Sequence, residues 1–151
     1  MIGFLADYPE TIPTLVRWFR DQWPGYFADQ SDAEMEQDFL SEAARNRIPS
    51  RLVAIQSSEL VGTIVLRGYA ADFLPEFQPG LGGLFVPEAH RRCGIGTELI
   101  RSGMELAAAQ GHETVYATTR AAAGILGRLG WEFIKTVVHD DERLGLYGCN
   151  L

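Results

Sequence analysis

Long hydrophobic runs are missing from this 151-residue sequence, because no apolar stretch reaches the ~18 residues that a membrane span needs. Cysteine is scarce, and Cys93 and Cys149 form neither a disulfide framework nor a spacing typical of zinc ligands. The first ten residues include Asp7 and lack the basic segment of a secretory signal peptide. These absences predict a cytoplasmic protein with reduced thiols, no metal site and no membrane partner.

Positive charge is also in short supply, with 13 Lys and Arg against 20 Asp and Glu and a net charge of −7. This balance argues against nucleic acid as a partner, since such proteins usually carry a basic surface. It favours a cationic substrate such as an amine, although many acidic proteins are acidic only for solubility. The length suits one domain with a sizeable core, and we predict a single domain over residues 1–151.

One stretch, Leu81–Gly111, has a pattern typical of a strand, a basic glycine-containing turn and a long helix. The strand is Leu84–Val86, and Pro87 ends it because proline lacks the N–H that a strand ladder needs. Gly111 suits the position just past the helix. The apolar stripe of the helix comprises Ile95, Leu99, Gly103 and Leu106, with Ile100, Met104 and Ala107 beside it.

The turn before this helix favours anion binding. A helix start leaves about four backbone N–H groups unpaired, and the helix dipole adds roughly half a positive charge there. Gly94 and Gly96 let a ligand approach the backbone, and Arg91 and Arg92 add charged donors. Together these features predict a diphosphate site.

Two common diphosphate motifs fit poorly. A Walker A loop needs a lysine that this turn lacks. A dinucleotide fingerprint needs a third glycine, where this sequence has Leu99, and it should follow its strand directly. A dinucleotide-binding α/β protein therefore stays the weaker alternative.

The stretch Val86–Gly96 instead resembles the acyl-CoA loop of the GNAT family of N-acetyltransferases, whose pattern is [Q/R]-x-x-G-x-[G/A]. Leu129-Gly130-Trp131-Glu132 resembles the L-G-F/W sequence that ends the last helix of this family. The resemblance is strong over about residues 81–138 and only topological before them.

The resemblance implies an α/β (α+β) fold, with a mixed, bent sheet of about six to seven strands and about four helices. We expect strands near residues 1–6, 51–56, 60–69, 84–86, 114–118, 131–138 and 143–151. Helices are expected from residue 7 or 11 to 23, from the Ser31-x-x-Glu34 capping box to about Asn46, from 95 to 110 and from 121 to 129. Gly82 and Gly83 indicate either a bulge or a loose entry to the cofactor strand.

The resemblance also implies acetyl-CoA as the cofactor. Pantetheine would lie between the strand at 84–86 and the next strand, and pair with backbone groups of Leu84, Phe85 and Val86. A backbone N–H, of Phe85 or Val86, would polarise the thioester carbonyl. The expected diphosphate site comprises Arg91, Arg92, Cys93, Gly94, Ile95, Gly96 and Thr97.

The catalytic residues are harder to assign. An alkylammonium must lose a proton before it attacks, and Glu76, Asp72 and His139 are candidate bases, of which we choose Glu76. Many family members place a tyrosine acid four residues before the L-G-F glycine, where this chain has Leu126. We therefore predict that Tyr116 donates the proton to the thiolate, with Tyr147 or water as alternatives.

Two loops are candidates for binding the acceptor. Residues 22–29 contain Trp23, Tyr26 and Phe27, which suit either a pocket or satellite core packing. Residues 70–80 expose carboxylates and aromatics and lead into the cofactor strand, although they suit a plain connector equally well.

We thus predict an acetyl-CoA-dependent N-acetyltransferase acting on a primary amine of a small molecule or peptide by direct attack in a ternary complex. The alternative is a CoA-binding module of the same fold that has lost catalysis, which the absent tyrosine favours. Many proteins of this fold dimerise, so a homodimer is also expected.

Overall fold

Seven strands form one mixed sheet in the computed structural model of the chain, which describes residues 1–151. The strands are β1 (Ile2–Phe4), β2 (Ser50–Gln56), β3 (Glu59–Arg67), β4 (Gly80–Phe85), β5 (Thr114–Thr119), β6 (Glu132–His139) and β7 (Glu142–Asn150). The helices are α1 (Ile12–Gln22), α2 (Asp32–Leu40), α3 (Ile95–Ala109) and α4 (Ala123–Arg128). The sheet order is β1-β2-β3-β4-β5-β7-β6, which confirms the predicted fold class.

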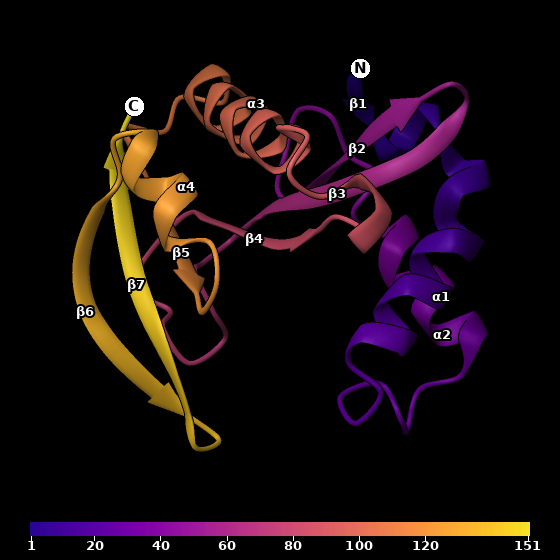
Figure 1. Cartoon of the computed structure of the whole chain (residues 1–151), viewed down its shortest axis with the longest axis horizontal. Helices are drawn as coiled ribbons and strands as arrows, with labels where there is room; N and C mark the ends of the chain where they lie inside the picture. The colour runs from indigo at the N-terminus through magenta and orange to yellow at the C-terminus, as the bar shows by residue number, and fades with distance from the viewer.

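Helices cover both faces of the sheet (Figure 1). Strand alternation sends Leu52 and Ala54 of β2 to one face and Val53 to the other. The first face packs against α3 and α4, through residues such as Leu99 and Leu126. The second face, which carries Val53, packs against α1 and α2. No helix is long and apolar enough to cross a membrane.

The sheet opens between β4 and β5, its one parallel pair. Gly80 and Tyr116 are the only residues paired there, and beyond them the two strands diverge (Figure 1). β4 is further bent where its register against β3 shifts and Gly83 adopts a φ of +60°. A left-handed φ at a bulge favours glycine, so the bulge interpretation of Gly82–Gly83 is confirmed.

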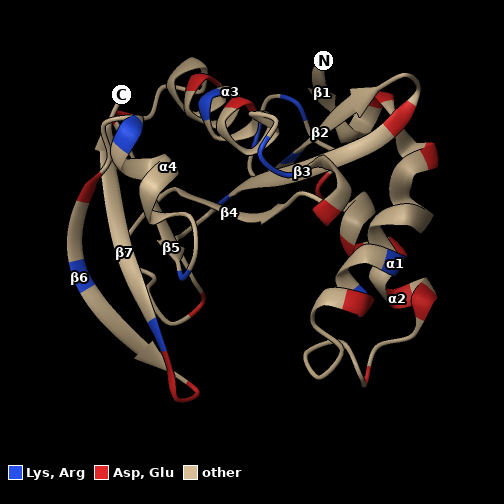
Figure 2. Ribbon diagram, in the orientation of Figure 1, with Lys and Arg blue, Asp and Glu red and all other residues tan.

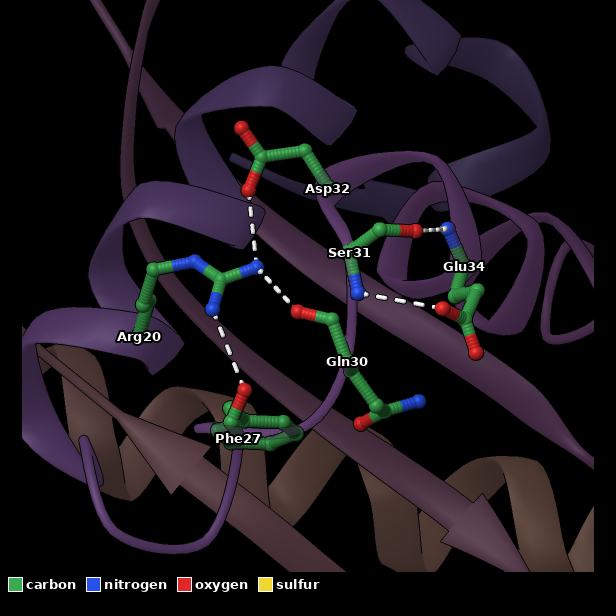
Figure 3. Close-up of polar contacts among 6 residues, drawn as sticks. All are labelled: Arg20, Phe27, Gln30, Ser31, Asp32 and Glu34. Atoms are coloured by element: carbon green, nitrogen blue, oxygen red, sulfur yellow. Dashed lines mark hydrogen bonds and ion pairs between the residues drawn. The ribbon is translucent and has the colours of Figure 1, made fainter.

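α2 is shorter than the sequence predicts. The capping box that opens it is confirmed, because Glu34 N donates to Ser31 Oγ at 3.1 Å and Ser31 N to Glu34 Oε1 at 3.2 Å (Figure 3). Its predicted end near Asn46 is wrong, because the helix ends at Leu40. The chain leaves the helix so that Glu42 pairs with the buried Arg51 of β2, with Nε and Oε1 2.8 Å apart.

The connection between α1 and α2 is held by Arg20 (Figure 3). Its guanidinium donates to the carbonyl oxygens of Phe27 at 3.1 Å and Gln30 at 2.9 Å, and to Asp32 Oδ1 at 2.7 Å. One side chain thereby fixes both ends of a loop that carries Trp23 and the exposed Tyr26.

Candidate active site

The N-terminus of α3 presents unpaired backbone donors. Gly94 precedes the helix with a φ of +83°, a left-handed conformation that favours glycine. The first helical hydrogen bond runs from Glu98 N to Gly94 O at 3.0 Å. The N–H groups of Ile95, Gly96 and Thr97 therefore lie ahead of the helical ladder and are available to an anion.

The loop before α3 is folded back on the end of β4. Arg91 Nε donates to Val86 O at 2.8 Å, and the short 3-10 turn η3 (Glu88–His90) lies between these residues. Arg91 and Arg92 are exposed and form no ion pair with a carboxylate of the chain. Their charge is thus free to act on a ligand at the helix start.

A cavity of about 830 Å³ joins this helix start to the opening between β4 and β5. Gly82 and Gly83 form part of its wall, and Ala117, Thr118 and Thr119 of β5 contribute from the opposite side. The predicted cofactor residues that line it are Leu84, Phe85, Val86, Arg91, Arg92, Gly94, Ile95, Gly96 and Thr97. Its size and its free donors fit a long, flexible, phosphate-bearing cofactor.

Three predicted residues lie outside this lining. Cys93 is exposed beside the cavity, with its Sγ 3.5 Å from Arg91 O. Glu76 is exposed in the loop between β3 and β4. Tyr116 points to the face opposite Val115 and Ala117, where its ring packs edge-on against Phe77 with centroids 5.3 Å apart. The structure does not bring Tyr116 or Glu76 together with the helix start.

Gln22 and Trp23 line the cavity at the end of α1, and both belong to the segment 22–29 that the sequence offers as an acceptor loop. The cavity also includes residues that sequence reasoning missed, and one of them, Arg128, reaches it from α4. Arg120 and Glu142 line its edge as an ion pair, with Nη1 and Oε1 2.7 Å apart. No local motif announces these residues, because each comes from a different segment of the chain.

The family model of the acetyltransferase (GNAT) family matches residues 12–131. The chain belongs to the GNAT family. No curated protein matches its sequence.

Solved structures of GNAT proteins share the fold across almost the whole chain. An aminoglycoside 6'-N-acetyltransferase complexed with coenzyme A is 18% identical, with a TM-score of 0.76 over 99% of this chain and 96% of the other. A ribosomal-protein-alanine N-acetyltransferase from Brucella melitensis is 18% identical, with a TM-score of 0.77 over 100% and 99%. A putative streptothricin acetyltransferase from Bacillus anthracis str. Ames, in complex with acetyl coenzyme A, is 16% identical, with a TM-score of 0.57 over 70% and 65%.

The aromatic segment at 22–29 of this GNAT protein contributes to the core and to the cavity wall, whereas its role in acceptor binding stays a prediction. Trp23 lines the cavity and also packs edge-on against Phe19 and Phe85, with centroids 5.1 Å and 6.1 Å apart. Phe27 packs against the core beneath α1 and α2, whereas Tyr26 is exposed. The segment is therefore part of the core and part of the cavity wall.

The loop at 70–80 is attached to the β6–β7 hairpin rather than to the cavity. Ala70 and Leu74 pack with Val137 and Leu146, and Phe73 stacks on His139 with centroids 4.1 Å apart. His139 is exposed and lies 3.3 Å from Asp140. No residue of this loop lines the 830 Å³ cavity.

The position at which many family members have a tyrosine is occupied by a core leucine in this chain. Leu126 is buried, packs with the cluster that includes Trp131, and contributes one wall of the cavity. Tyr116 lines a second cavity of about 240 Å³, which Cys149 also borders. Burial, reinforced by Glu132, raises the pKa of the Cys149 thiol.

Proposed function

We propose that the protein is an acetyl-CoA-dependent N-acetyltransferase that acetylates a primary amine of a small molecule or peptide. The observation that supports this most is that one cavity joins the free N–H groups of α3 to the opening between β4 and β5. An anion-binding helix start and a pair of diverging strands suit the two ends of the same cofactor.

The chain's own groups divide the binding between them. The N–H groups of Ile95, Gly96 and Thr97 would hold the diphosphate, with Arg91 and Arg92 supplying charge. A Cβ on Gly96 would lie 3.6 Å from Ile125 Cδ1, so the protein itself leaves room there and the missing side chain serves the ligand. Backbone groups of Leu84, Phe85 and Val86 would pair with pantetheine amides in the manner of an added strand.

Acetyl-CoA supplies a thioester that is reactive toward a neutral amine. A backbone N–H of Phe85 or Val86 would hold the carbonyl oxygen as negative charge develops there. Trp23 and Gln22 would help to exclude water and orient the amine from the opposite side. Alignment of this kind supplies much of the acceleration of an acyl transfer.

The proton transfers stay predictions. Glu76 is the predicted base, and its exposed position suits delivery of a proton to solvent or through water. Tyr116 is the acid that the sequence predicts, but its ring packs against Phe77 and does not line the cavity. With Leu126 in the usual tyrosine position, water or Tyr147 is the alternative donor. A cytoplasmic location and a homodimer also stay predictions.

The test is release of free thiol from acetyl-CoA in the presence of amines, aminoglycosides, polyamines and peptide N-termini, with mass spectrometry of the product. We expect thiol release to depend on one class of amine and the product to gain an acetyl group. Binding of acetyl-CoA without thiol release for any amine would instead favour the non-catalytic CoA-binding module.

A further inference from the structure

Two arginines cross the bare backbone of β4 next to the cavity. A Cβ on Gly82 would lie 2.5 Å from Arg67 Nη2, and one on Gly83 would lie 3.3 Å from Arg51 Nη2. Both glycines line the cavity, whereas neither arginine does, so the guanidinium groups lie directly behind the glycine backbone of this wall. Because Leu66 faces α3, alternation along β3 sends Arg67 to the opposite face, which carries α1 and α2.

The charge of the Arg51 guanidinium is balanced by partners within the protein. Arg51 is 3% exposed, pairs with Glu42, and donates through Nη1 to Thr63 Oγ1 at 3.0 Å. Its guanidinium lies over the rings of Phe19 and Phe39, 5.2 Å and 5.1 Å from their centroids. A buried cation with a carboxylate partner and aromatic neighbours is a stable structural element.

The charge of the Arg67 guanidinium has no such partners. Its single hydrogen bond runs from Nη2 to Ala70 O at 2.9 Å, and no carboxylate lies within ion-pair distance. Its Nε is buried without a partner. Burial and the nearby charge of Arg51 lower the pKa of Arg67, and the influence of Asp72, Glu42 and Tyr26 only partly opposes them.

A mostly buried guanidinium with so few partners is costly for the protein to keep. Removing the other partner of a buried cation is destabilising, so an uncompensated one calls for an anion that the protein does not itself provide. The Nη1 atom of Arg67 also has no hydrogen-bond partner in the chain, and unlike Nε it is not fully buried.

We propose that Arg67 binds the carboxylate of a zwitterionic acceptor, an amino acid or a compound with the same pairing of amine and carboxylate. This inference rests on the proposed N-acetyltransferase function. A guanidinium is well suited to a carboxylate because its donors match the two oxygens. With its carboxylate at Arg67 beside Gly82, the acceptor would place its amine at the β4 wall of the cavity.

The charges around the site fit the other half of such a molecule. Glu142 lines the cavity but is already paired with Arg120, so the unbalanced negative charge comes from Asp140 and Asp141 at the tip of the β6–β7 hairpin, where acidic residues gather (Figure 2). This acidic tip would attract the ammonium group of an incoming acceptor. A polycationic acceptor would meet the same tip but would be repelled by Arg67.

The wild-type protein provides the first test. Thiol release from acetyl-CoA is measured with each of the common L-amino acids and with its primary amide, which keeps the amine and loses the carboxylate charge. We expect at least one free acid to be acetylated with a kcat/KM about 10- to 100-fold above that of its amide. Acetylation of no free acid, or equal rates for acid and amide, would overturn the proposal.

Variants of Arg67 test whether this residue causes the preference for the free acid over the amide. Arg67→Gln should lower the ratio of kcat/KM for acid to kcat/KM for amide to about 1, while the affinity for acetyl-CoA stays unchanged. Arg67→Lys should keep part of the preference, and Arg101→Gln on the exposed side of α3 is the matched control. A preference that survives in Arg67→Gln would contradict the assignment.

The failure of this inference is distinguishable from failure of the proposed function. Amines acetylated without preference for a carboxylate would leave the N-acetyltransferase intact and remove the role of Arg67. No binding of acetyl-CoA to the wild-type protein would overturn both.

Discussion

The two sides of the cavity are built in different ways. The side at the start of α3 comes from one continuous stretch and relies on backbone N–H groups, glycine conformation and two exposed arginines. The side that faces α1 and the β6–β7 hairpin is assembled from side chains of distant segments, such as Trp23, Arg120 and Glu142, with Arg67 behind Gly82. A backbone site suits a constant cofactor, whereas a convergence of side chains suits an acceptor that differs between proteins of one fold.

The largest effect is expected on the backbone side. Gly96→Glu places a carboxylate where the diphosphate would lie, and like charges at close range should weaken acetyl-CoA binding by about 100-fold or more. The fold should persist, since a Cβ at Gly96 makes only an ordinary contact with Ile125. Calorimetry measures the affinity, and Gly127→Glu, at an open helical position of α4, is the control. Unchanged affinity in a folded Gly96→Glu protein would remove the cofactor site from this helix.

An intermediate effect is expected on the side-chain half. Arg20→Ala removes three hydrogen bonds from the α1–α2 connection (Figure 3), which should cost about 1–2 kcal/mol of stability and loosen Trp23. We expect KM for the acceptor to rise by about 10-fold, which corresponds to a free-energy change of the same size as the loss of stability. The affinity for acetyl-CoA should stay the same. Arg17→Ala, an exposed position on the same helix, is the control. A matching loss of acetyl-CoA affinity would mean that the two halves are not independent.

The difference between the halves also explains what the sequence could predict. The start of α3 at Ile95 and the left-handed Gly111 beyond its end follow from local periodicity and glycine chemistry, and both are confirmed. The end of α2 could not be predicted, because Glu42 leaves the helix for Arg51, a residue on a strand still to come. Arg67 could not be identified from the sequence either, because only the three-dimensional structure shows that its guanidinium has no carboxylate partner.

The two cysteines differ in exposure, and their reactivity therefore distinguishes the edge of the site from the protein interior. Cys93 is exposed beside the helix start, whereas Cys149 is buried with a raised thiol pKa and so carries less thiolate at neutral pH. Iodoacetamide should label Cys93 several-fold faster, and acetyl-CoA should slow only that reaction. Raising the pH toward the elevated pKa of Cys149 should bring the two labelling rates closer together, because Cys149 then gains thiolate. Mass spectrometry of labelled peptides follows both sites; equal labelling of Cys93 with and without acetyl-CoA would contradict its placement at the site.

The smallest effect is expected at Tyr116. Its ring packs against Phe77 and does not line the cavity, so we expect Tyr116→Phe to change kcat by less than about 2-fold. A loss of about 10- to 100-fold, with KM for acetyl-CoA unchanged, would instead make Tyr116 the general acid that the sequence predicts. Tyr147→Phe is the companion variant, because that ring packs on the α4 side of the sheet.

The central claim is that the start of α3 and the diverging edge of β4 bind one cofactor together. Hydrogen–deuterium exchange with and without acetyl-CoA tests it most directly, because it reports on backbone N–H groups themselves. The account predicts that acetyl-CoA slows exchange at Ile95, Gly96 and Thr97 and at Leu84–Val86, and leaves α2 unchanged. Saturating acetyl-CoA with no protection at either segment, or protection confined to residues 132–150, would contradict it.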